Sequence, residues 1–411
     1  MGYETDNTME KRDQRVADAI ALKEPDRIPF TPKSSRAVVQ AGGINMREAT
    51  TDFRNMKDGV RKFLTRYEMD MFIAPAFYPI PAMEALDTEF IRWAGKDGLD
   101  ENSIHQIVDK VYVEEEDYDM LIHDPSRFLL QRAWPMRHKK LRALSKVSFD
   151  NVWELGHWAS MAAFADPEVQ EAFAALAVAG QKAIEWQQQS AELCQVALET
   201  QTPLGPLAGM TTAYDMFADN LRGFVNLPMD VLTMPEKVTE VLDIMQVKCL
   251  EVCRGLGAAG MKYNFIPLHG GMDSFMSNEN YEKFYWKYLR EMIELNASLG
   301  MISHVFVEGP YMSRLEFLKE VPKGMVVYTF EDVDMAKAKK ILGDTACIAG
   351  NIDSAELAFG SKENIIEQTK RLINDVAPGG GFMFDSSIPI DIYNEENMDA
   401  WYETVIKEGV Y

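Results

Sequence analysis

The chain has 411 residues, of which 47% are apolar and 26% are charged, and its formal net charge is −22. The apolar fraction is high enough for a large buried core, which excludes an intrinsically disordered protein. The strong acidity argues against binding to nucleic acid or to anionic membranes, because both partners would be repelled.

The first part of the chain predicts two strands, each preceded by a helix. The N-terminus is polar and lacks the apolar stretch of a signal peptide. A helical pattern then covers residues 12–23, and a strand is expected at 27–31. A second helix ends near Tyr67, and a second strand is expected at 71–77.

Residues 80–190 interrupt this pattern. They contain a short β-like segment at 90–95, an acidic run at 114–117, and helical material that follows Asp124 and continues to about residue 190. We interpret them as an insertion after the second strand. Such insertions often act as a lid or as a wall of a pocket.

From about residue 190 onward, short apolar runs alternate with amphipathic helical segments. Six strands are expected there, at 193–198, 262–271, 301–309, 325–332, 346–351 and 381–387. This alternation predicts a parallel sheet, because a parallel crossover needs a connection of helical size. Two strands plus six give the number that closes a (β/α)8 barrel.

A doubly wound open sheet is the alternative, but no glycine-rich phosphate turn follows the first strand. We therefore predict an α/β fold, namely a single (β/α)8 TIM barrel over residues 1–411. A mainly helical insertion at about 80–190 would belong to the same domain.

The four cysteines are too few for a disulfide framework. Cys249 and Cys253 lie four residues apart in a helical pattern, so they share one face. A two-thiolate metal site is one interpretation, although buried inert cysteines are commoner. The Ala-rich segment 172–180 is too short to span a bilayer. We expect a soluble, cytoplasmic protein.

Five segments of the chain carry a resemblance to a known family: RVADAIALKEPDRIPF (15–30), FMSNENYEKFYWKYL (275–289), HVFVEGPYMSRLEFLKEVPKG (304–324), CIAGNIDSAELAFGSKENIIEQTKRLI (347–373) and GGGFMFDSSIPIDIYNEENMDAW (379–401). They are similar to the uroporphyrinogen decarboxylase superfamily, in which the segment Gly350-Asn351-Ile352-Asp353 is fairly specific. The resemblance implies a (β/α)8 barrel with one of two chemistries. One is porphyrinogen decarboxylation without a cofactor, and the other is zinc-dependent methyl transfer to or from a corrinoid protein.

The chain departs from the decarboxylase branch of that superfamily. The decarboxylase holds its polycarboxylate substrate with a basic N-terminal loop, of which only Lys33 and Arg36 are present here. The family's catalytic aspartate after the second strand has no clear counterpart in residues 72–81. Decarboxylation of a porphyrinogen is therefore disfavoured.

The chain also departs from the zinc methyltransferases, which typically show His-x-Cys after one strand and a second Cys after the last. Here these places read His304-Val305-Phe306 and Asp385-Ser386-Ser387. The resemblance then implies His304, Glu308 and Asp385 as zinc ligands. Such a site would be harder and more Lewis-acidic than a thiolate site. It suits the polarisation of an ether or alcohol oxygen so that a methyl group can leave.

Candidate residues are those at the carboxyl ends of predicted strands, where barrel enzymes place their chemistry. We predict catalytic roles for His304, Glu308 and His269, which precedes two glycines. A buried structural histidine and a structural ion pair are the alternatives for His304 and Glu308. Four further residues are expected to bind substrate: Glu199, Asn351, Tyr78 and Asp273.

The leading hypothesis is a methyltransferase that passes a methyl group from a small methylated substrate to the Co(I) of a corrinoid carried by a partner protein. A methoxylated aromatic substrate is favoured. His304, with Glu308 and Asp385, would bind zinc or protonate the leaving oxygen. A cofactor-independent decarboxylase of a uroporphyrinogen-like acid and a non-catalytic barrel that binds a tetrapyrrole or corrinoid are the alternatives. No nucleic acid or membrane partner is expected, and a homodimer is compatible with this type of barrel.

Overall fold

A five-stranded parallel sheet forms the centre of the protein, for which a computed structural model describes residues 7–108, 110–148 and 157–411. Its strands are β3 (Tyr263–Leu268), β4 (Ile302–Pro310), β5 (Val326–Asp332), β6 (Cys347–Ala349) and β7 (Phe382–Met383). They pair in chain order, each parallel to the next. The predicted α/β class with parallel strands is confirmed.

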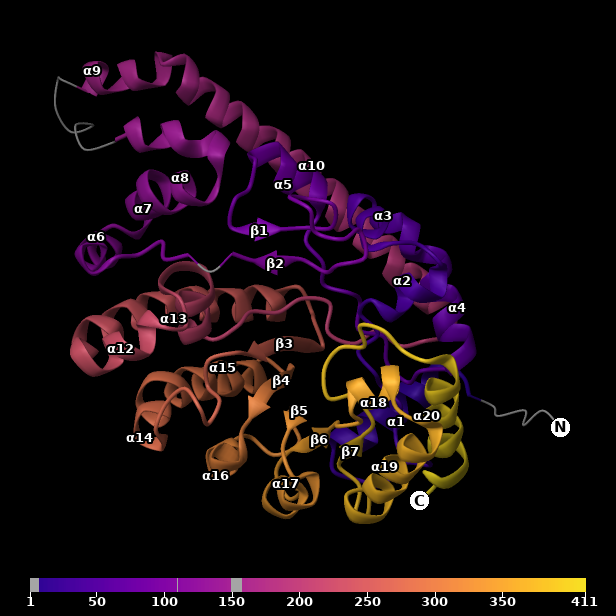
Figure 1. The fold of residues 1–411 in the computed structure, drawn as a ribbon. Helices are drawn as coiled ribbons and strands as arrows, with labels where there is room; N and C mark the ends of the chain where they lie inside the picture. Colours follow the sequence, from indigo (N-terminus) through magenta and orange to yellow (C-terminus); the bar gives the residue numbers. More distant parts are fainter. Residues whose placement is uncertain (1–6, 109, 149–156) are drawn as a thin grey trace.

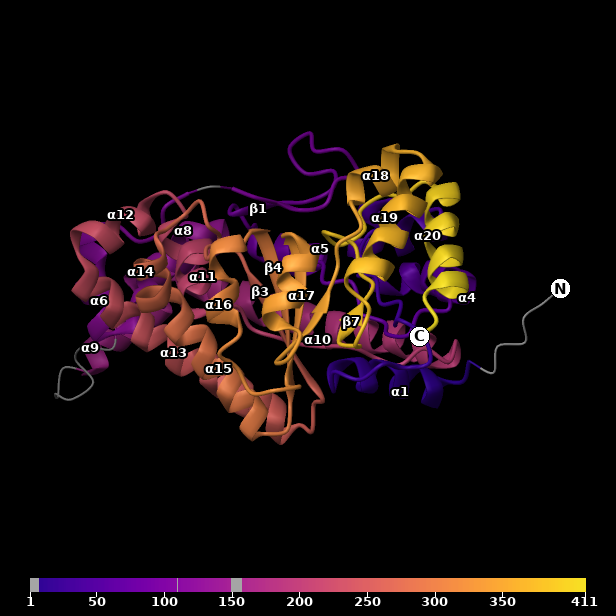
Figure 2. The same ribbon diagram turned by 90° about the horizontal axis from the view of Figure 1, so that it is seen from below.

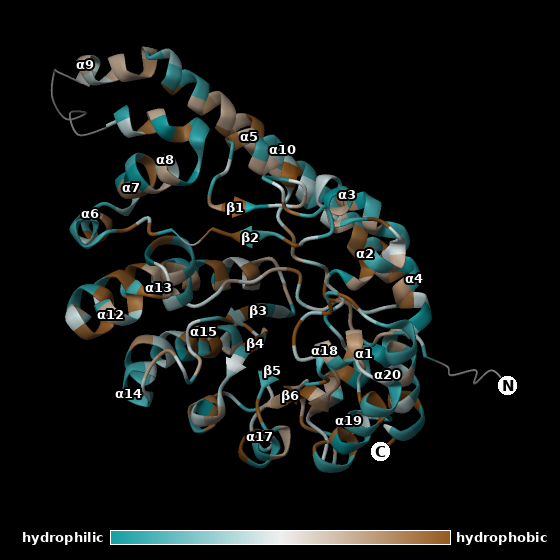
Figure 3. Cartoon of the chain, viewed as in Figure 1, coloured by the Kyte–Doolittle hydropathy of each residue, from teal (hydrophilic) through white to brown (hydrophobic). Residues whose placement is uncertain are grey.

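Helices connect these strands and cover the outer side of the curved sheet (Figure 1). They are α14 (Asn278–Tyr281), the π-helical turn η7 (Glu282–Trp286), α15 (Lys287–Ser298), the 3-10 turn η8 (Met312–Arg314), α16 (Leu315–Leu318), α17 (Met335–Leu342), α18 (Ser354–Phe359), α19 (Lys362–Asp375) and, after β7, α20 (Glu395–Glu408). Hydrophobic and hydrophilic residues alternate along them, as expected for helices with one buried face (Figure 3).

Three further extended segments, residues 28–31, 70–72 and 203–210, lie between β7 and β3. The first pairs with the residue after β7, the second pairs with the first and the third, and the third pairs with β3. The backbone N···O distances of these contacts are 2.8–3.1 Å. Phe30 with Phe384, Phe72 with Leu204 and Gly209 with Phe265 form isolated β-bridges, whereas Asp70 and Phe30 share a single backbone hydrogen bond. Together these contacts connect β7 back to β3.

The strand predicted at 193–198 is wrong. These residues form the last turns of α10 (Pro167–Glu199), a 33-residue helix that Asp166 caps. Leu193, Val196 and Ala197 are its buried residues there, and this spacing places them on one helix face. The extended segment follows at 203–210 instead, where prolines and glycines prevent a helix.

The described part of the predicted insertion that precedes α10 is mainly helical. It contains α5 (Ile80–Leu86), β1 (Ile91–Arg92), β2 (Gln106–Ile107), η2 (Glu115–Asp117), α6 (Tyr118–His123), α7 (Pro125–Phe128), η3 (Leu129–Ala133), α8 (Trp134–Arg137), η4 (Lys139–Lys146), α9 (His157–Met161) and η5 (Ala162–Ala165). The antiparallel pair β1–β2 occurs where the β-like segment was expected. Figure 2 shows β1 on the side of α18, opposite to α1. Since α18 follows β6, this is the side of the carboxyl ends of the strands.

The remaining helices precede the first and second extended segments or follow the third. They are α1 (Met9–Ile20), α2 (Ala37–Gly42), α3 (Met46–Thr51), η1 (Phe53–Met56), α4 (Lys57–Tyr67), α11 (Ala213–Phe217), the π-helical turn η6 (Ala218–Arg222), α12 (Asn226–Thr233) and α13 (Pro235–Ala258). Within the described ranges, none of the helices has both the length and the apolar character that a membrane span requires.

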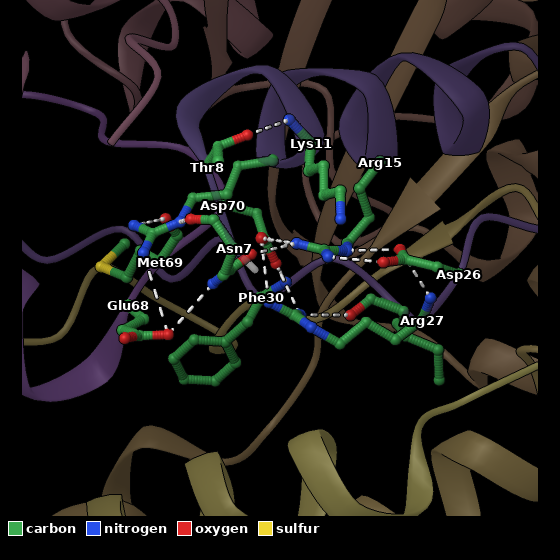
Figure 4. Close-up of polar contacts among 12 residues, drawn as sticks. Asn7, Thr8, Lys11, Arg15, Asp26, Arg27, Phe30, Glu68, Met69 and Asp70 are labelled. Atoms are coloured by element: carbon green, nitrogen blue, oxygen red, sulfur yellow. Dashed lines mark hydrogen bonds and ion pairs between the residues drawn. The ribbon is translucent and has the colours of Figure 1, made fainter. Parts of the chain in front are cut away.

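A buried ion cluster joins α1 to the amino ends of the first two extended segments (Figure 4). Asp70 is fully buried, and it accepts hydrogen bonds from Arg15, from Arg27 (2.7 and 3.0 Å) and from the Phe30 N–H (2.7 Å). Arg15 also pairs with the more exposed Asp26. In barrel folds this end of the strands serves stability, and catalysis occurs at the other end.

Candidate active site

A histidine and three carboxylates meet at the carboxyl ends of β3, β4 and β5. His269 directly follows β3, Glu308 lies near the end of β4, and Glu331 lies near the end of β5. Asp219 comes from the turn η6. The Nδ1 atom of His269 lies 2.7 Å from Asp219 Oδ2, and its Nε2 atom lies 3.8 Å from Glu308 Oε1.

The surrounding carboxylates keep the His269 ring charged. Burial opposes the charge, but the hydrogen bond to Asp219 and the charges of Asp215, Asp219 and Glu308 outweigh it. Together they raise the pKa of His269 to about 9. At neutral pH the ring is therefore an imidazolium, with Nδ1–H held by Asp219 and Nε2–H on the side of Glu308.

For Glu308, the influences on the pKa favour the neutral form of the side chain. Burial is the largest influence, the His269 charge opposes it, and the negative charges of Glu331 and Asp215 add to it. The pKa of Glu308 rises to about 7 as a result. Glu331 is held in place by the Gly309 N–H, which donates to its Oε2 atom at 2.7 Å. A half-ionised carboxyl thus lies beside a proton donor, which is typical of acid–base sites.

The fully buried Asp215 supports this arrangement from behind. It accepts hydrogen bonds from the backbone N–H groups of His269 (3.2 Å) and Gly270 (2.7 Å). The hydroxyls of Thr212 (3.1 Å) and Tyr285 also donate to it. Burial nevertheless raises the pKa of Asp215. The end of β3 is therefore fixed to α11, and this contact orients the imidazole.

The predicted zinc ligands surround a lysine. Lys33 forms a buried ion pair with Asp385, and its backbone N–H donates to the same carboxylate at 3.0 Å. Burial lowers the pKa of Lys33, whereas the charges of Asp385 and Glu308 oppose this. Burial, with a contribution from Lys33, also lowers the pKa of His304 to about 3. His304 is instead a neutral core residue whose Nε2 lies 3.1 Å from the Thr329 hydroxyl.

The side-chain contacts therefore do not fit a zinc ion held by His304, Glu308 and Asp385. Across the described ranges, no three His, Cys, Asp or Glu side chains form a group that could hold a metal ion. The cationic place beside Asp385 is occupied by the ammonium group of Lys33.

The thiols on α13 match the inert interpretation. Cys249 donates to the Thr211 carbonyl at 3.5 Å, and Cys253 accepts from the Asn264 amide at 3.3 Å. Burial raises the pKa of the two thiols to about 12 and about 11, respectively. Neither is therefore a thiolate at neutral pH.

The four residues predicted to bind substrate have different positions. Tyr78 is 44% exposed near Asp219, and its ring contacts His105 edge-on at a centroid distance of 4.7 Å. Asn351 donates to the backbone carbonyls of Glu331, near the end of β5, and of Val333, just after it. Asp273 accepts from Ser313 and ties the loop after β3 to η8.

Glu199 is the clearest departure, because it lies in the last turn of a helix and not at a strand end. Its exposed carboxylate pairs with Arg61 on α4 at 2.8 Å. This is a surface ion pair between two helices.

Sequence patterns missed Asp215 and Asp219, which lie on a helical segment away from any strand end. One signal was present for Asp215, because Thr212 three residues earlier gives the spacing of a helix-capping box. Asp219 follows four residues later, on the same helix face. Nothing local to the sequence shows that this face meets His269.

Comparisons with known proteins agree with this fold. The family model described as uroporphyrinogen decarboxylase (URO-D) matches residues 161–407, more than half of the chain. No curated protein matches. Among solved structures, a methyltransferase from Methanosarcina mazei is 14% identical, with 97% of this chain and 98% of that chain covered and a TM-score of 0.62. A B12-independent methionine synthase from Shewanella sp. W3-18-1 covers 51% of this chain and 62% of its own, at 13% identity and a TM-score of 0.36.

The likeness to the Methanosarcina protein is one of fold, given its low identity. The family match is independent of it and includes β3 to β7, with His269 and Glu308. The chain belongs to the uroporphyrinogen decarboxylase family.

Proposed function

We propose that this protein is a methyltransferase that takes a methyl group from a small methylated substrate, a methoxylated aromatic being favoured. The acceptor would be the Co(I) centre of a corrinoid carried by a separate protein. The observation that carries the proposal is the His269 imidazolium, held by Asp219 and facing Glu308 at the carboxyl ends of the strands. It is a proton donor for a leaving oxygen.

The reaction balances with this single donor. The methyl group would pass to the Co(I) of the partner's corrinoid, which acts as the second substrate. The C–O bond would break with its electron pair on oxygen, and the oxygen would take the Nε2 proton of His269. The products would be an alcohol or phenol and the methylated corrinoid. The negative charge of Glu308 or Asp219 then favours reprotonation of the ring from solvent. Apart from the cobalt of the partner's corrinoid, this step uses no metal ion, and zinc at the predicted ligands is not part of it.

The position of the site supports the proposal. We infer that the ring of eight extended segments is a (β/α)8 barrel and that the inserted region forms one wall of its mouth. The insertion contacts the segment that carries Asp219, because the N–H groups of Tyr112 and Val113 both donate to Leu221. Such a wall would exclude water from the leaving group.

Porphyrinogen decarboxylation is the rival that the family match favours. Two observations count against it. Lys33 and Arg36, the basic residues of the N-terminal loop, are already paired with Asp385 and Asp391. The mouth is also rich in carboxylates, which would repel a substrate with many carboxylates of its own.

The test follows methyl transfer to cob(I)alamin, kept reduced, from a panel of methoxylated aromatics. Methylcobalamin is measured by absorbance and the demethylated product by chromatography. His269→Gln should lower the rate by about 100-fold or more, since general acids contribute about 10² to 10⁴. His123→Gln, in an exposed position on α6, is the matched control and should have no effect. Unchanged transfer in His269→Gln, or release of CO2 from a uroporphyrinogen without methyl transfer, would contradict the proposal.

A further inference from the structure

The long helix α10 exposes a face that carries no charge. It runs along the outer edge of the molecule (Figure 1) and packs inward against α5, η4, η1 and α4. Every exposed residue within 173–191, a range that the structure describes throughout, is uncharged: Phe173, Ala174, Ala177, Val178, Gly180, Gln181, Ile184, Gln187, Gln188 and Ala191. Phe173, Val178 and Ile184 are 39%, 52% and 50% exposed. A solvated helix face normally carries charged residues, so this composition is typical of a face that another element covers.

Six of these residues have the spacing of a helix that pairs with another helix. They follow one another at alternating intervals of four and three residues: Phe173, Ala177, Gly180, Ile184, Gln187 and Ala191. Such a repeat keeps one stripe of a helix turned toward a partner helix along its whole length. The stripe is about 27 Å long, since a helix rises about 1.5 Å per residue. The pattern therefore predicts that a second helix covers this stripe.

Gly180 lacks a structural reason within its own chain. It lies near the middle of α10, where glycine weakens a helix relative to alanine. A Cβ atom placed there would meet nothing within 4 Å, and no positive φ requires the glycine. The other common reason for a glycine in a helix is the close approach of another backbone. Among the residues that the structure describes, none supplies that backbone.

A second copy of α10, running antiparallel, fits the stripe. If Gly180 of one copy lies opposite Ile184 of the other, the same register places Phe173 opposite Ala191. Each large side chain then meets a small one, and each contact occurs twice, because a two-fold axis relates the copies. With a different protein as partner, nothing would relate the small residues of α10 to its own large ones. The second copy is therefore the occupant that explains the pattern.

The charges beside the stripe agree with this arrangement. A groove of about 680 Å³ separates the N-terminal half of α10 from η4. Lys140 lines it and has no carboxylate partner within the described ranges, whereas Glu168 and Glu171 line it nearer to the start of the helix. Glu185 lies seven residues after Val178, which lines the groove, so the two share one edge of α10. In an antiparallel pair, Glu185 of one copy lies beside the groove of the other.

We propose that two copies of this chain form a two-fold dimer through antiparallel contact of their α10 helices. The inference is independent of the proposed function. The helices are already folded, so little conformational entropy is lost when they pair. Each copy has a net charge of −22, and the stripe lets two copies approach without bringing carboxylates together. The stripe is short for a standard interface, which buries about 1,600 Å² in total, so we expect a reversible dimer.

The test is sedimentation equilibrium at about 1 to about 100 µM protein, the range in which small interfaces dissociate. Wild-type protein should shift from the mass of one chain to that of two. Gly180→Leu should raise the dissociation constant at least about tenfold, because the leucine overfills the contact with Ile184 of the second copy, twice in each dimer. The matched control Gly255→Leu changes a glycine of α13 with equally open surroundings and should leave the dimer intact.

Every outcome decides the inference. A wild-type chain that stays monomeric over this range would overturn it, whatever else covers the face. A dimer that Gly180→Leu leaves unchanged, or that Gly255→Leu weakens equally, would do the same. Gly180→Leu should fold, because its leucine meets open space in the monomer and favours the helix.

Circular dichroism at the lowest concentration checks the folding of Gly180→Leu. If that variant is unfolded, Ile184→Glu replaces it, since Ile184 is half exposed in the monomer. Ile184→Glu should abolish the dimer, because it brings two unpaired carboxylates into the contact. A dimer that survives Ile184→Glu would refute the pairing of the α10 helices.

Discussion

The charge of the His269 imidazole depends on Asp219, and this dependence can be measured directly. In Asp219→Asn the side chain keeps its shape and loses its negative charge. Burial then acts with less opposition, so the pKa of His269 should fall from about 9 toward its ordinary value of about 6.5.

A lower pKa of His269 reduces the fraction of the imidazole that carries the proton to be donated. At pH 7.5, a group with a pKa of about 9 is roughly 97% protonated, whereas one with a pKa of about 6.5 is roughly 9% protonated. If the pKa of His269 fell to about 6.5, methyl transfer that depends on its proton would therefore be about tenfold slower at this pH. At pH 6 the donor would again be mostly protonated, so the difference between wild type and variant should shrink.

The assay is an NMR titration of the histidine ring protons in protein labelled at histidine. The chain has only six histidines, and the spectrum of His269→Gln assigns the signal. The control is Asp273→Asn, which changes a carboxylate in the loop after β3 that pairs with Ser313 rather than His269. A pKa of His269 that stays near 9 in Asp219→Asn, or that falls equally in Asp273→Asn, would refute the assigned cause.

Three further predictions concern stability, pH and metal. Asp70→Asn leaves two buried arginines without their shared carboxylate and should lower the free energy of unfolding by about 3–5 kcal/mol in urea titrations. Its control, Asp26→Asn, removes a more exposed partner and should cost under about 1 kcal/mol; equal losses would show that burial does not set the cost. Glu308 has a raised pKa of about 7, so its carboxyl becomes ionised as the pH rises through 7. The rate of wild-type methyl transfer should therefore change near pH 7, and the rate of Glu308→Gln should not. If the change persists in Glu308→Gln, another group causes it. Because the Lys33 ammonium fills the space beside Asp385, methyl transfer should survive dialysis against a chelator, and a loss that zinc restores would show this arrangement to be wrong.

The sequence predicted the elements from β3 onward well, because local chemistry determines them. Apolar runs between helix caps predict buried parallel strands, and Ser277, Asp334 and Ser361 cap the helices that follow β3, β5 and β6. The same reasoning placed His269 and Glu308 at strand ends, where the structure has them. It failed at 193–198, because a short apolar run fits a helix face as well as a strand.

The tertiary structure alone decided which polar groups meet and in which charge state. Lys33 and Asp385 are 352 residues apart in the chain, and their ion pair is what takes Asp385 and His304 out of the predicted zinc site. Asp219 reaches His269 across 50 residues of the chain. Periodicity and capping act over a few residues, so they determine the elements of this protein. The charge of a buried group depends on its distance to charges brought from far along the chain and on its exclusion from water, which arise only when the chain is folded.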